Sequence, residues 1–381
     1  MTTTAQLCVA HVNSDMGFSG GEVQVFLTVE GLRALGHRPV LYCQPGSWSA
    51  RQAAQRDFEW VPVRMRNDLD LAAIISLARG FRRRGAHLVH LHSGRANWLG
   101  GIAAWAERLP AITTRRMDRR VKRNWRTRLI YERFTQCAVA ISPAVSACLI
   151  DAGVRPERVR LIYDAVDATR LQPSVGREPT RAALGAGPDD RVLLTLAALI
   201  HRKGLDVLLD ALAQLRAAGL RPLLWIAGDG PERAALGTQA ERLGLREQVR
   251  FLAARSDAAD LLAACDLFVL PSRREGLGVA ALEAMAAGRA VVCSAVGGLQ
   301  HAVVDGRTGL LFPPGDAHAL SRTLARLLQN DDLRTRLGQA GPARIGEGFL
   351  AEQMVDAYQQ LYREVMHEWD DDRSCGAPRE P

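Results

Sequence analysis

The chain has 381 residues, of which 48% are hydrophobic and 24% charged, with a formal net charge of +8 at pH 7. This length allows two domains with a hydrophobic core each, and the composition is ordinary for a soluble globular protein. No apolar run reaches the ~18 residues of a membrane-spanning helix, and no basic segment precedes the first apolar stretch, which argues against a signal peptide. The seven cysteines are scattered without a CxxC pair, as expected for core thiols in a reducing cytoplasm.

The first half of the chain alternates between short apolar strands and helices. We expect strands at residues 7–12, 40–43, 88–92, 139–142 and 159–162. A glycine-rich loop at 17–21 leads from the first strand into a helix that ends near residue 35, and another helix covers 144–152. This alternation indicates α/β layers built on a parallel sheet.

The second half repeats the same alternation after a stretch rich in proline, glycine and charge. We expect strands at 192–197, 222–227, 249–252, 267–270 and 290–293, and helices at 204–218, 231–243 and 317–330. The predicted organisation is a first domain, a linker, a second domain, a C-terminal helix and a disordered tail, at 1–168, 169–188, 189–348, 349–368 and 369–381. Two such halves would bind ligands near the carboxyl ends of their strands.

The segment 271–288, PSRREGLGVAALEAMAAG, carries the strongest candidate site. Glu275 and Glu283 lie eight residues apart, a little over two helical turns, so both carboxylates can face one ligand. The turn from strand to helix between them presents free amides that attract phosphate, and its glycines allow close approach. These amides belong to Gly276, Leu277, Gly278 and Val279. A helix cap with a surface glutamate is the alternative, and the flanking residues favour a site for a phosphorylated, hydroxyl-rich ligand.

A pair of cations, Arg202 and Lys203, follows the first strand of the second half and precedes a helix. Arginine with its planar fork and lysine as a point charge can together hold a diphosphate. Basic residues in loops are often merely solvated, but the position of this pair at a strand end favours a ligand site.

The first half offers weaker candidates. Gly20 and Gly21 would let a ligand approach the backbone, although a tight turn explains them equally well. His90 and His92 fall on one face of a strand, with His92 near its carboxyl end, where a ligand or catalytic role is favoured. His90 is expected to be a core residue. Metal binding would require further ligands, and the neighbouring sequence suggests none.

Positive charge is concentrated in one region of the first half. Residues 82–133 contain 14 Lys or Arg and 3 Asp or Glu, whereas the rest of the chain contains 35 and 38. Within this region Trp125, Ile130 and Phe134 with their basic neighbours form a candidate amphipathic surface helix. We expect an anionic partner, a phospholipid surface or a phosphorylated acceptor, rather than nucleic acid, for which no binding fingerprint is present. A solvated charged surface is the alternative.

Residues 190–315 resemble the nucleotide-sugar-binding half of family 4 glycosyltransferases, which have two Rossmann-like domains (the GT-B fold) and retain the anomeric configuration. The resemblance rests on LAALIHRKGLDVLLDAL, WIAGDGPER and the segment that runs from VRFLAARSD through PSRREGLGVAALEAMAAG to LLFPPGD. The first half is similar more loosely, through GFSGGE, HLVHLHSG and ISPAV. The resemblance implies two domains facing across a cleft, the first on the acceptor side, with the helix at 349–368 packing back on that domain.

The resemblance also implies roles for single residues. Glu283 would hold the donor ribose, and Glu275 would contact the transferred sugar. Arg202 and Lys203 would neutralise the leaving diphosphate in place of a metal. The amides of Gly276 to Val279 would bind the distal phosphate. Gly20 and Gly21 would approach the donor phosphates or the acceptor, and His92 would contact the sugar.

Three positions depart from the family. Ala198 stands where relatives often have arginine, Asp164-Ala165 where an Asn-Gly pair is usual, and Gln300-His301 where Pro-Glu often follows the paired glycines. The first change would leave the diphosphate charge mainly to Arg202 and Lys203. None of them affects the two carboxylates.

The expected function is therefore a metal-independent, retaining transfer of a hexose from a nucleoside-diphosphate sugar to an acceptor hydroxyl. The basic region favours a lipid-linked or phosphorylated glycan acceptor, as in lipopolysaccharide or other cell-envelope synthesis, and a cytoplasmic protein at the inner face of the plasma membrane. The alternatives are a nucleotide-sugar epimerase or phosphorylase on the same fold, or a non-catalytic nucleotide-sugar or nucleic-acid binder.

Overall fold

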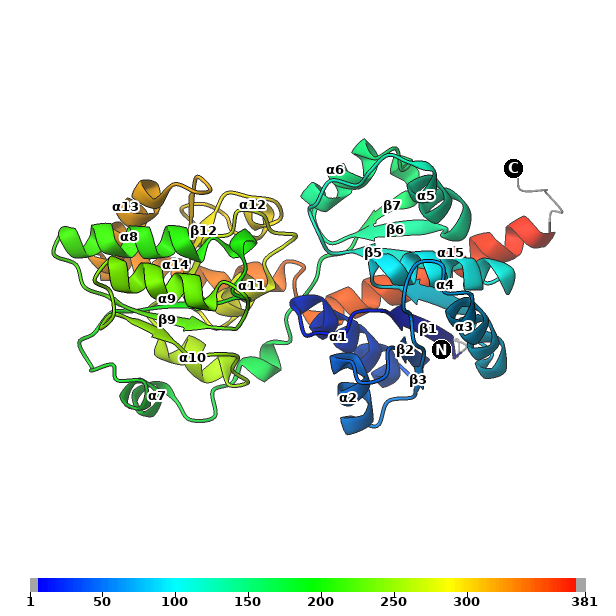
Figure 1. Cartoon of the computed structure of the whole chain (residues 1–381), viewed down its shortest axis with the longest axis horizontal. Coiled ribbons are helices and arrows are strands. Elements are labelled where there is room, and N and C mark those ends of the chain that lie inside the picture. The colour runs from blue at the N-terminus through cyan, green and yellow to red at the C-terminus, as the bar shows by residue number, and fades with distance from the viewer. Residues whose placement is uncertain (1–5, 375–381) are drawn as a thin grey trace. The chain divides into compact units, whose positions relative to one another are not determined.

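The computed structural model describes residues 6–374, which divide into two compact units. Unit 1 takes the residues up to Tyr163 together with those from Ala351 on, and unit 2 spans Asp164–Leu350. In each unit, helices cover both faces of a parallel sheet (Figure 1). The expected α/β class with two parallel-sheet domains is confirmed. Among the described residues, none of the helices combines the length and apolarity that crossing a membrane would require.

The sheet of unit 1 has seven strands in the order β3-β2-β1-β4-β5-β6-β7. The strands are β1 (Cys8–Asn13), β2 (Arg38–Cys43), β3 (Trp60–Pro62), β4 (Leu88–Leu91), β5 (Ala111–Arg115), β6 (Cys137–Ala140) and β7 (Val159–Leu161). The helices are α1 (Gly20–Ala34), α2 (Trp48–Gln55), α3 (Leu71–Arg84), α4 (Gly94–Ala106), α5 (Trp125–Arg128), α6 (Pro143–Asp151) and α15 (Ala351–Ser374). The strand order reverses direction between β1 and β4, and ligands of such sheets bind beyond the carboxyl ends of the strands at this point.

The sheet of unit 2 has six strands in the order β10-β9-β8-β11-β12-β13. The strands are β8 (Val192–Leu196), β9 (Leu223–Ala227), β10 (Val249–Phe251), β11 (Leu267–Leu270), β12 (Ala290–Ser294) and β13 (Leu310–Phe312). The helices are α7 (Arg177–Ala183), α8 (Leu205–Ala217), α9 (Arg233–Arg242), α10 (Ala258–Ala264), α11 (Val279–Ala286), α12 (Leu299–Ala302), α13 (Ala317–Leu328) and α14 (Asp331–Gly346). Here the order reverses between β8 and β11, whose carboxyl ends carry the cation pair and the two-carboxylate segment.

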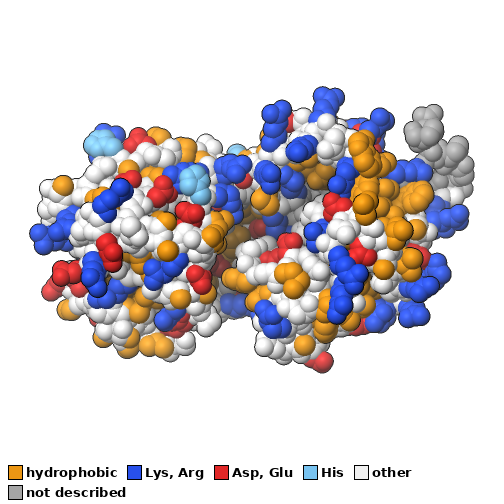
Figure 2. Space-filling model, viewed as in Figure 1, with side chains coloured by type: hydrophobic (Ala, Val, Ile, Leu, Met, Phe, Trp, Pro, Cys, Tyr) orange, Lys and Arg blue, Asp and Glu red, His pale blue; other side chains and the backbone are white. Residues whose placement is uncertain are grey.

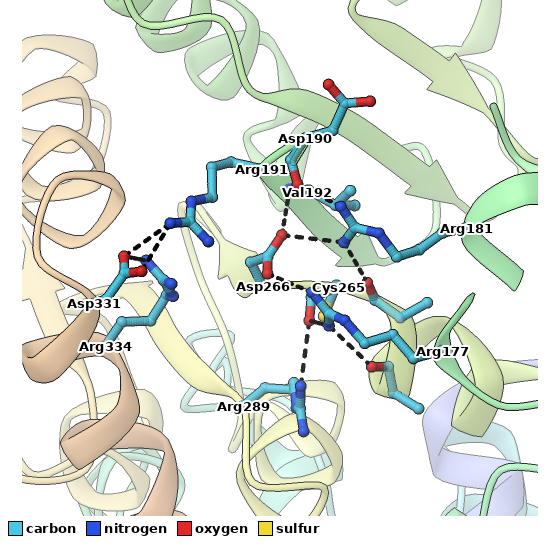
Figure 3. Close-up of polar contacts among 12 residues, drawn as sticks. Arg177, Arg181, Asp190, Arg191, Val192, Cys265, Asp266, Arg289, Asp331 and Arg334 are labelled. Atoms are coloured by element: carbon cyan, nitrogen blue, oxygen red, sulfur yellow. Dashed lines mark hydrogen bonds and ion pairs between the residues drawn. The ribbon is translucent and has the colours of Figure 1, made fainter. Parts of the chain in front are cut away.

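The expected linker at 169–188 is a structured part of unit 2. Its helix α7 is fixed by Asp266, which precedes β11 and accepts hydrogen bonds from Arg177 at 2.7 Å and from Arg181 at 3.3 Å (Figure 3). The side chain of Arg181 is only 1% exposed and also donates to backbone carbonyls, including that of Gly187 at 2.8 Å. The charged residues Arg177 and Arg181 of this stretch therefore belong to a polar network with Asp266 at the amino ends of the strands.

Helix α15 follows unit 2 in the chain but belongs to unit 1. It packs closely on α1, because a Cβ atom at Gly31 would lie 2.3 Å from a methyl group of Val355. Tyr362 adds a hydrogen bond of 2.7 Å to the His90 ring of β4. The helix ends at Ser374, so residues 369–374 of the expected tail are helical, and the rest of that tail lies outside the described residues.

The candidate amphipathic surface helix with Trp125, Ile130 and Phe134 lies in a short helical stretch that begins well after the end of β5. Strand β5 ends at Arg115, residues 116–124 contain neither helix nor strand, and α5 begins only at Trp125. A π-helical turn, Leu129–Phe134, follows directly. The helical stretch therefore has ten residues.

Candidate functional site

In unit 2, two loops at the carboxyl ends of β8 and β11 are joined by hydrogen bonds. The amide of Arg273 donates to the carbonyl of Arg202 at 2.8 Å, and its guanidinium donates to the carbonyl of His201 at 3.0 Å. The same guanidinium forms two 2.6 Å hydrogen bonds with the carboxylate of Asp206 in α8. These contacts hold the cation pair beside the two-carboxylate segment, 72 residues further along the chain.

Glu275 is the centre of this arrangement. Its side chain is buried and receives a short hydrogen bond from the ammonium group of Lys203. The hydroxyl of Ser272 donates to the same carboxylate at 3.1 Å, and the guanidinium of Arg202 lies 3.7 Å from its other oxygen. This carboxylate therefore contacts both cations at the carboxyl ends of the strands.

Two glycines make the close packing of these loops possible. Gly204 has a φ of +65°, and a Cβ atom there would lie 2.1 Å from the carbonyl oxygen of Pro271. Gly278 has a φ of +91° and caps α11, with a side chain of Leu299 only 2.4 Å from where its Cβ would be. A side chain at position 204 would therefore push the two loops apart, and a side chain at position 278 would push α12 away from the start of α11.

Helix α11 begins directly beside Glu275, and no side chain caps its first turn. Its free amide groups and positive dipole end are therefore available to an anion. Within the described residues the carboxylate of Glu283, one turn into the helix, has no hydrogen-bond or ion-pair partner. Burial raises the pKa of Glu283 to about 7. A partly buried carboxyl group without a partner among the described residues, next to a helix end that can bind an anion, is a strong indication of a ligand.

In unit 1, the glycine-rich loop runs from the end of β1 into α1. Ser19 caps the helix, accepting from the amide of Gly21 at 3.1 Å and donating to Glu22 at 2.6 Å. Neither Gly20 nor Gly21 has a positive φ, so the backbone conformation does not require glycine at these positions. What the absence of a side chain provides is space next to the backbone. A Cβ atom at Gly21 would lie 3.4 Å from the side chain of Arg116, which follows β5.

Three buried histidines lie together at the point where the strand order of unit 1 reverses. His11 of β1 pairs in register with His90 of β4, and His92 follows β4. Nδ1 of His11 lies 3.0 Å from Nε2 of His92, with the rings stacked at 8°. His90 is hydrogen-bonded through both nitrogens, to the hydroxyls of Tyr362 and Thr114, each at 2.7 Å. Its expected role as a core residue agrees with this burial.

All three imidazoles are held in the neutral form. Burial is the largest cause, and the guanidinium of Arg116 adds to it, so the pKa of His11 falls to about 3 and those of His90 and His92 fall well below 6.5. One nitrogen of each histidine falls in a group whose members all lie within 4.8 Å, a donor set that a transition metal would accept. The two hydroxyl partners of His90 and the nearby guanidinium favour a hydrogen-bonded network instead.

The sequence-predicted residues thus form two groups. Unit 2 brings together Glu275, Arg202, Lys203, the amides of 276–279 and Glu283, and unit 1 places His92 and the glycine loop at its own strand ends. Sequence reasoning missed Ser272, His11 and Arg116. A histidine inside the otherwise apolar strand CVAHVN was the available signal for His11. Nothing marked Arg116 among its basic neighbours.

Comparison with known proteins places the chain in a family. A model described as Glycosyl transferases group 1 matches residues 176–344, and one described as Glycosyltransferase Family 4 matches residues 18–170. The lipopolysaccharide core biosynthesis glycosyltransferase LpsE of Rhizobium meliloti (strain 1021) is 31% identical over 316 residues, 77% of this chain and 90% of LpsE. The chain belongs to the family 4 glycosyltransferases.

Further relatives agree with this assignment. A D-inositol 3-phosphate glycosyltransferase of Saccharomonospora viridis is 33% identical to this glycosyltransferase over 73% of the chain and 70% of the relative. Anabaena Alr3699/HepE, solved with UDP and glucose, has a TM-score of 0.84 at 21% identity, covering 94% of this chain and 100% of that one. A Rickettsia africae glycosyltransferase has a TM-score of 0.85 at 18% identity, covering 95% and 99%. These two likenesses show that the fold is shared.

Proposed function

We propose that this glycosyltransferase moves a hexose from a nucleoside-diphosphate sugar to an acceptor hydroxyl with retention of configuration. The observation that carries the proposal is the group of Glu275, Lys203 and Arg202 beside the start of α11. Glu283 in the same helix has no partner among residues 6–374. Cations and free amides suit a diphosphate, and a carboxylate suits a ribose diol. The complexes of HepE with UDP, with UDP and glucose and with UDP-glucose support the same ligand class.

Each residue of the unit 2 site has a distinct role in this proposal. Glu283 accepts hydrogen bonds from the ribose hydroxyls. The amides of 276–279 bind the distal phosphate, while Lys203 and Arg202 neutralise the charge that develops on the diphosphate as the anomeric bond breaks. Glu275 contacts the transferred sugar and orients Lys203. Gly20, Gly21 and His92 of unit 1 contribute to binding the donor phosphates, the sugar or the acceptor.

Electrostatic stabilisation of the leaving group is the main catalytic effect that these residues supply. Prepositioned cations and amides act where the charge appears, and losing one such contact typically costs ~3 kcal/mol, about a hundredfold in rate. The two cations perform the task that a bound metal performs in other sugar transferases, so the proposed reaction is metal-independent. Asp68 and Asp70 formally match a metal-binding DxD, but Asp70 caps α3 by accepting from the amide of Ala73 at 3.0 Å.

The donor proposal is tested by thermal denaturation with a panel of UDP, GDP and ADP sugars. A bound donor raises the melting temperature by mass action, and one base should give a larger shift than the others. Glu283→Gln should reduce that shift, and Glu241→Gln, in α9, serves as the control. No shift with any nucleotide sugar, at concentrations up to the millimolar range, would contradict the donor site.

For the acceptor we propose a lipid-linked or phosphorylated glycan of the cell envelope, such as a lipopolysaccharide precursor. The names of the relatives support both chemistries, since LpsE acts in lipopolysaccharide core biosynthesis and another group of relatives are D-inositol 3-phosphate glycosyltransferases. We further propose that the enzyme works in the cytoplasm, at the inner face of the plasma membrane.

The surface of unit 1 supports this membrane proposal. Figure 2 shows an apolar patch bordered by Lys and Arg side chains on this unit. Trp125 and Trp105 are 66% and 48% exposed, and Arg133 lies 5.6 Å above the Trp105 ring. Trp125 also lines a groove of about 1260 Å³, together with apolar residues of α15. The charge of the groove itself is mixed, since its lining includes Arg128, Arg133, Arg155, Arg158 and Arg160 as well as Glu132, Glu157, Glu364 and Glu368. Aromatic rings with neighbouring arginines suit an anionic lipid surface.

The groove lies at the amino ends of β6 and β7, away from the strand ends that carry His92 and the glycine loop. Contact with a membrane there would leave those strand ends uncovered. The test is sedimentation with vesicles of phosphatidylglycerol or of phosphatidylcholine alone, at low and high salt. Binding should require the anionic lipid, weaken with salt and fall with Trp125→Ser, and binding indifferent to anionic lipid would contradict the proposal.

A nucleotide-sugar epimerase or phosphorylase on the same fold is the second candidate, because the same cations and carboxylates would bind its substrate. Product analysis with labelled donor separates them, since transfer gives a larger glycoside, epimerisation an isomer of the donor and phosphorolysis a sugar phosphate. A non-catalytic binder would consume no donor at all. Nucleic acid remains outside the proposal.

A further inference from the structure

The histidines of unit 1 are connected to Arg116 in a way that determines where their protons are. Nη1 of Arg116 lies 3.3 Å from Nδ1 of His92. A guanidinium group can only donate hydrogen bonds. Nδ1 of His92 must therefore accept, and the neutral ring must carry its proton on Nε2.

The same argument extends to the next ring. Nε2 of His92 lies 3.0 Å from Nδ1 of His11, so the proton on His92 is donated to His11. His11 then carries its own proton on Nε2, an atom that is buried and has no hydrogen-bond partner among the described residues. One cation thus sets the tautomers of two histidines in series.

We propose that Arg116 and His11 are positioning residues that fix the proton of His92 on Nε2 and so preset Nδ1 as a hydrogen-bond acceptor. This inference rests on the proposed function of His92 as a residue that contacts the sugar or the acceptor. In the structure both ring nitrogens of His92 are engaged, Nδ1 by Arg116 and Nε2 by His11. A ligand that draws the guanidinium away from His92 would leave Nδ1 open to a ligand hydroxyl, which would meet a ring already protonated on Nε2.

The position of Arg116 suits that exchange. Its side chain passes beside Gly21 at the start of α1, where the glycine loop of unit 1 lies. A substrate anion near this loop would compete with His92 for the guanidinium. Without substrate, Arg116 would occupy Nδ1 of His92 by its hydrogen bond. When an anionic substrate binds the guanidinium, Nδ1 would become free to accept from the substrate.

The other groups around His92 do not impose the opposite tautomer. The titratable neighbours are His11 on β1, His90 on β4, and Tyr358 and Tyr362 on α15. His90 contacts the hydroxyl of Tyr362 directly at 2.7 Å and is connected to Tyr358 through Thr114, whose hydroxyl lies 2.7 Å from His90 and 2.9 Å from Tyr358. Hydroxyl groups can donate or accept, so the contacts of His90 are compatible with either of its tautomers. Only the guanidinium of Arg116, which cannot accept, determines which nitrogens donate and which accept in the network.

The tautomer is measured directly by ¹⁵N NMR of the full-length protein labelled at histidine, with the His92 signals assigned by their loss in His92→Gln. The expected result is a neutral His92 ring protonated at Nε2 at pH 7. In Arg116→Met the ring should become a mixture of tautomers, and its pKa should move upward because a neighbouring cation is gone. Arg116→Lys, which keeps a donor and a charge, should restore most of the wild-type signal.

Two outcomes overturn the proposal. One is a wild-type His92 protonated at Nδ1, and the other is a tautomer unchanged in a folded Arg116→Met. His11→Phe keeps an aromatic ring but removes the acceptor for the Nε2 proton of His92. In this variant too, the His92 ring should become a mixture of tautomers. The measurement needs no substrate, so a correct tautomer together with donor binding unaffected by His92→Gln would refute the role of His92 in the proposed function and leave the positioning intact.

Discussion

Lys203 and Glu275 form a short ion pair across the carboxyl ends of β8 and β11. Only 14% of the lysine side chain and 10% of the glutamate side chain are exposed. In the proposed enzyme the lysine must serve both this carboxylate and the diphosphate of the donor. The pair therefore holds the cation in place before the substrate arrives.

Replacing Lys203 with methionine should lower kcat/KM about a hundredfold, because ~3 kcal/mol of leaving-group stabilisation is lost. The measurement is donor turnover at fixed acceptor concentration. Arg255→Met, which breaks only the surface pair with Asp257, is the control and should retain full activity. Turnover unchanged by Lys203→Met would show that the diphosphate is bound elsewhere.

Donor affinity should depend on the protonation of Glu283. With a pKa raised to about 7 by burial, much of this carboxyl group is protonated below neutrality and then accepts fewer hydrogen bonds from a ribose diol. Affinity should therefore rise as the pH increases from 6 to 8. Glu283→Gln should bind more weakly and lose this pH dependence, as measured by calorimetric titration with the donor. An equal pH dependence in both proteins would exclude Glu283 as its source.

The same pKa predicts a stability effect without donor. A carboxyl group with a folded-state pKa above its unfolded value of 4.5 binds more protons in the native state, so its contribution to the free energy of unfolding falls as the pH rises from about 4.5 to 7. Glu283→Gln removes this pH-dependent contribution to the free energy of unfolding. The stability difference between variant and wild type should therefore grow in favour of the variant across that range in denaturant titrations. A difference constant with pH would contradict the raised pKa.

Asp266 should contribute strongly to the stability of unit 2. Asp266→Asn leaves the buried guanidinium of Arg181 without its counter-charge, and breaking a buried pair in this way costs ~3–5 kcal/mol. Hydrogen exchange at the start of β8 should accelerate, since the amide of Val192 donates to Asp266 at 2.7 Å (Figure 3). Asp331→Asn is the matched control, because that carboxylate is 59% exposed and its pairs with Arg191 and Arg334 are each worth at most ~1 kcal/mol. Equal effects of the two substitutions would contradict the role of burial.

Gly278→Ala should destabilise the chain more than Gly288→Ala. Both glycines have a positive φ, which costs an alanine ~1–2 kcal/mol. Only at Gly278 would the new methyl group also meet a neighbour, Leu299, at 2.4 Å. Gly278→Ala should in addition weaken donor binding, because it displaces the first turn of α11, and a normal donor-induced melting shift would contradict that.

Much of the fold follows from local patterns, and the exceptions have physical causes. The strands that lie in the middle of each sheet are apolar runs, so β1, β4, β8 and β11 were predicted nearly to their ends. Three strands were not predicted: β3 and β13 have only three residues each, and β5, AITTR, mixes apolar residues with two threonines and an arginine. The linker prediction failed because Arg177 and Arg181 look like solvated charges until Asp266 is placed beside them.

The candidate site shows the same division. Glu275, Glu283, Arg202 and Lys203 lie in motifs whose spacing follows a strand end and a helix, so the sequence alone indicates a common site. The pairing of Lys203 with Glu275 depends on the crossover that places β8 next to β11. The contact between Arg116 and His92 depends on β4 and β5 being neighbours, and no local pattern distinguishes this arginine from the thirteen other basic residues of 82–133.

The most direct test of glycosyl transfer is the fate of a labelled nucleotide sugar, chosen from the thermal panel, in the presence of a membrane extract as acceptor source. We predict that the label moves into a larger glycoside with the anomeric configuration of the donor, and that Lys203→Met slows this transfer about a hundredfold while Arg255→Met does not. Recovery of the label as an isomer of the donor, as a sugar phosphate, or as unchanged donor with every acceptor would contradict the account.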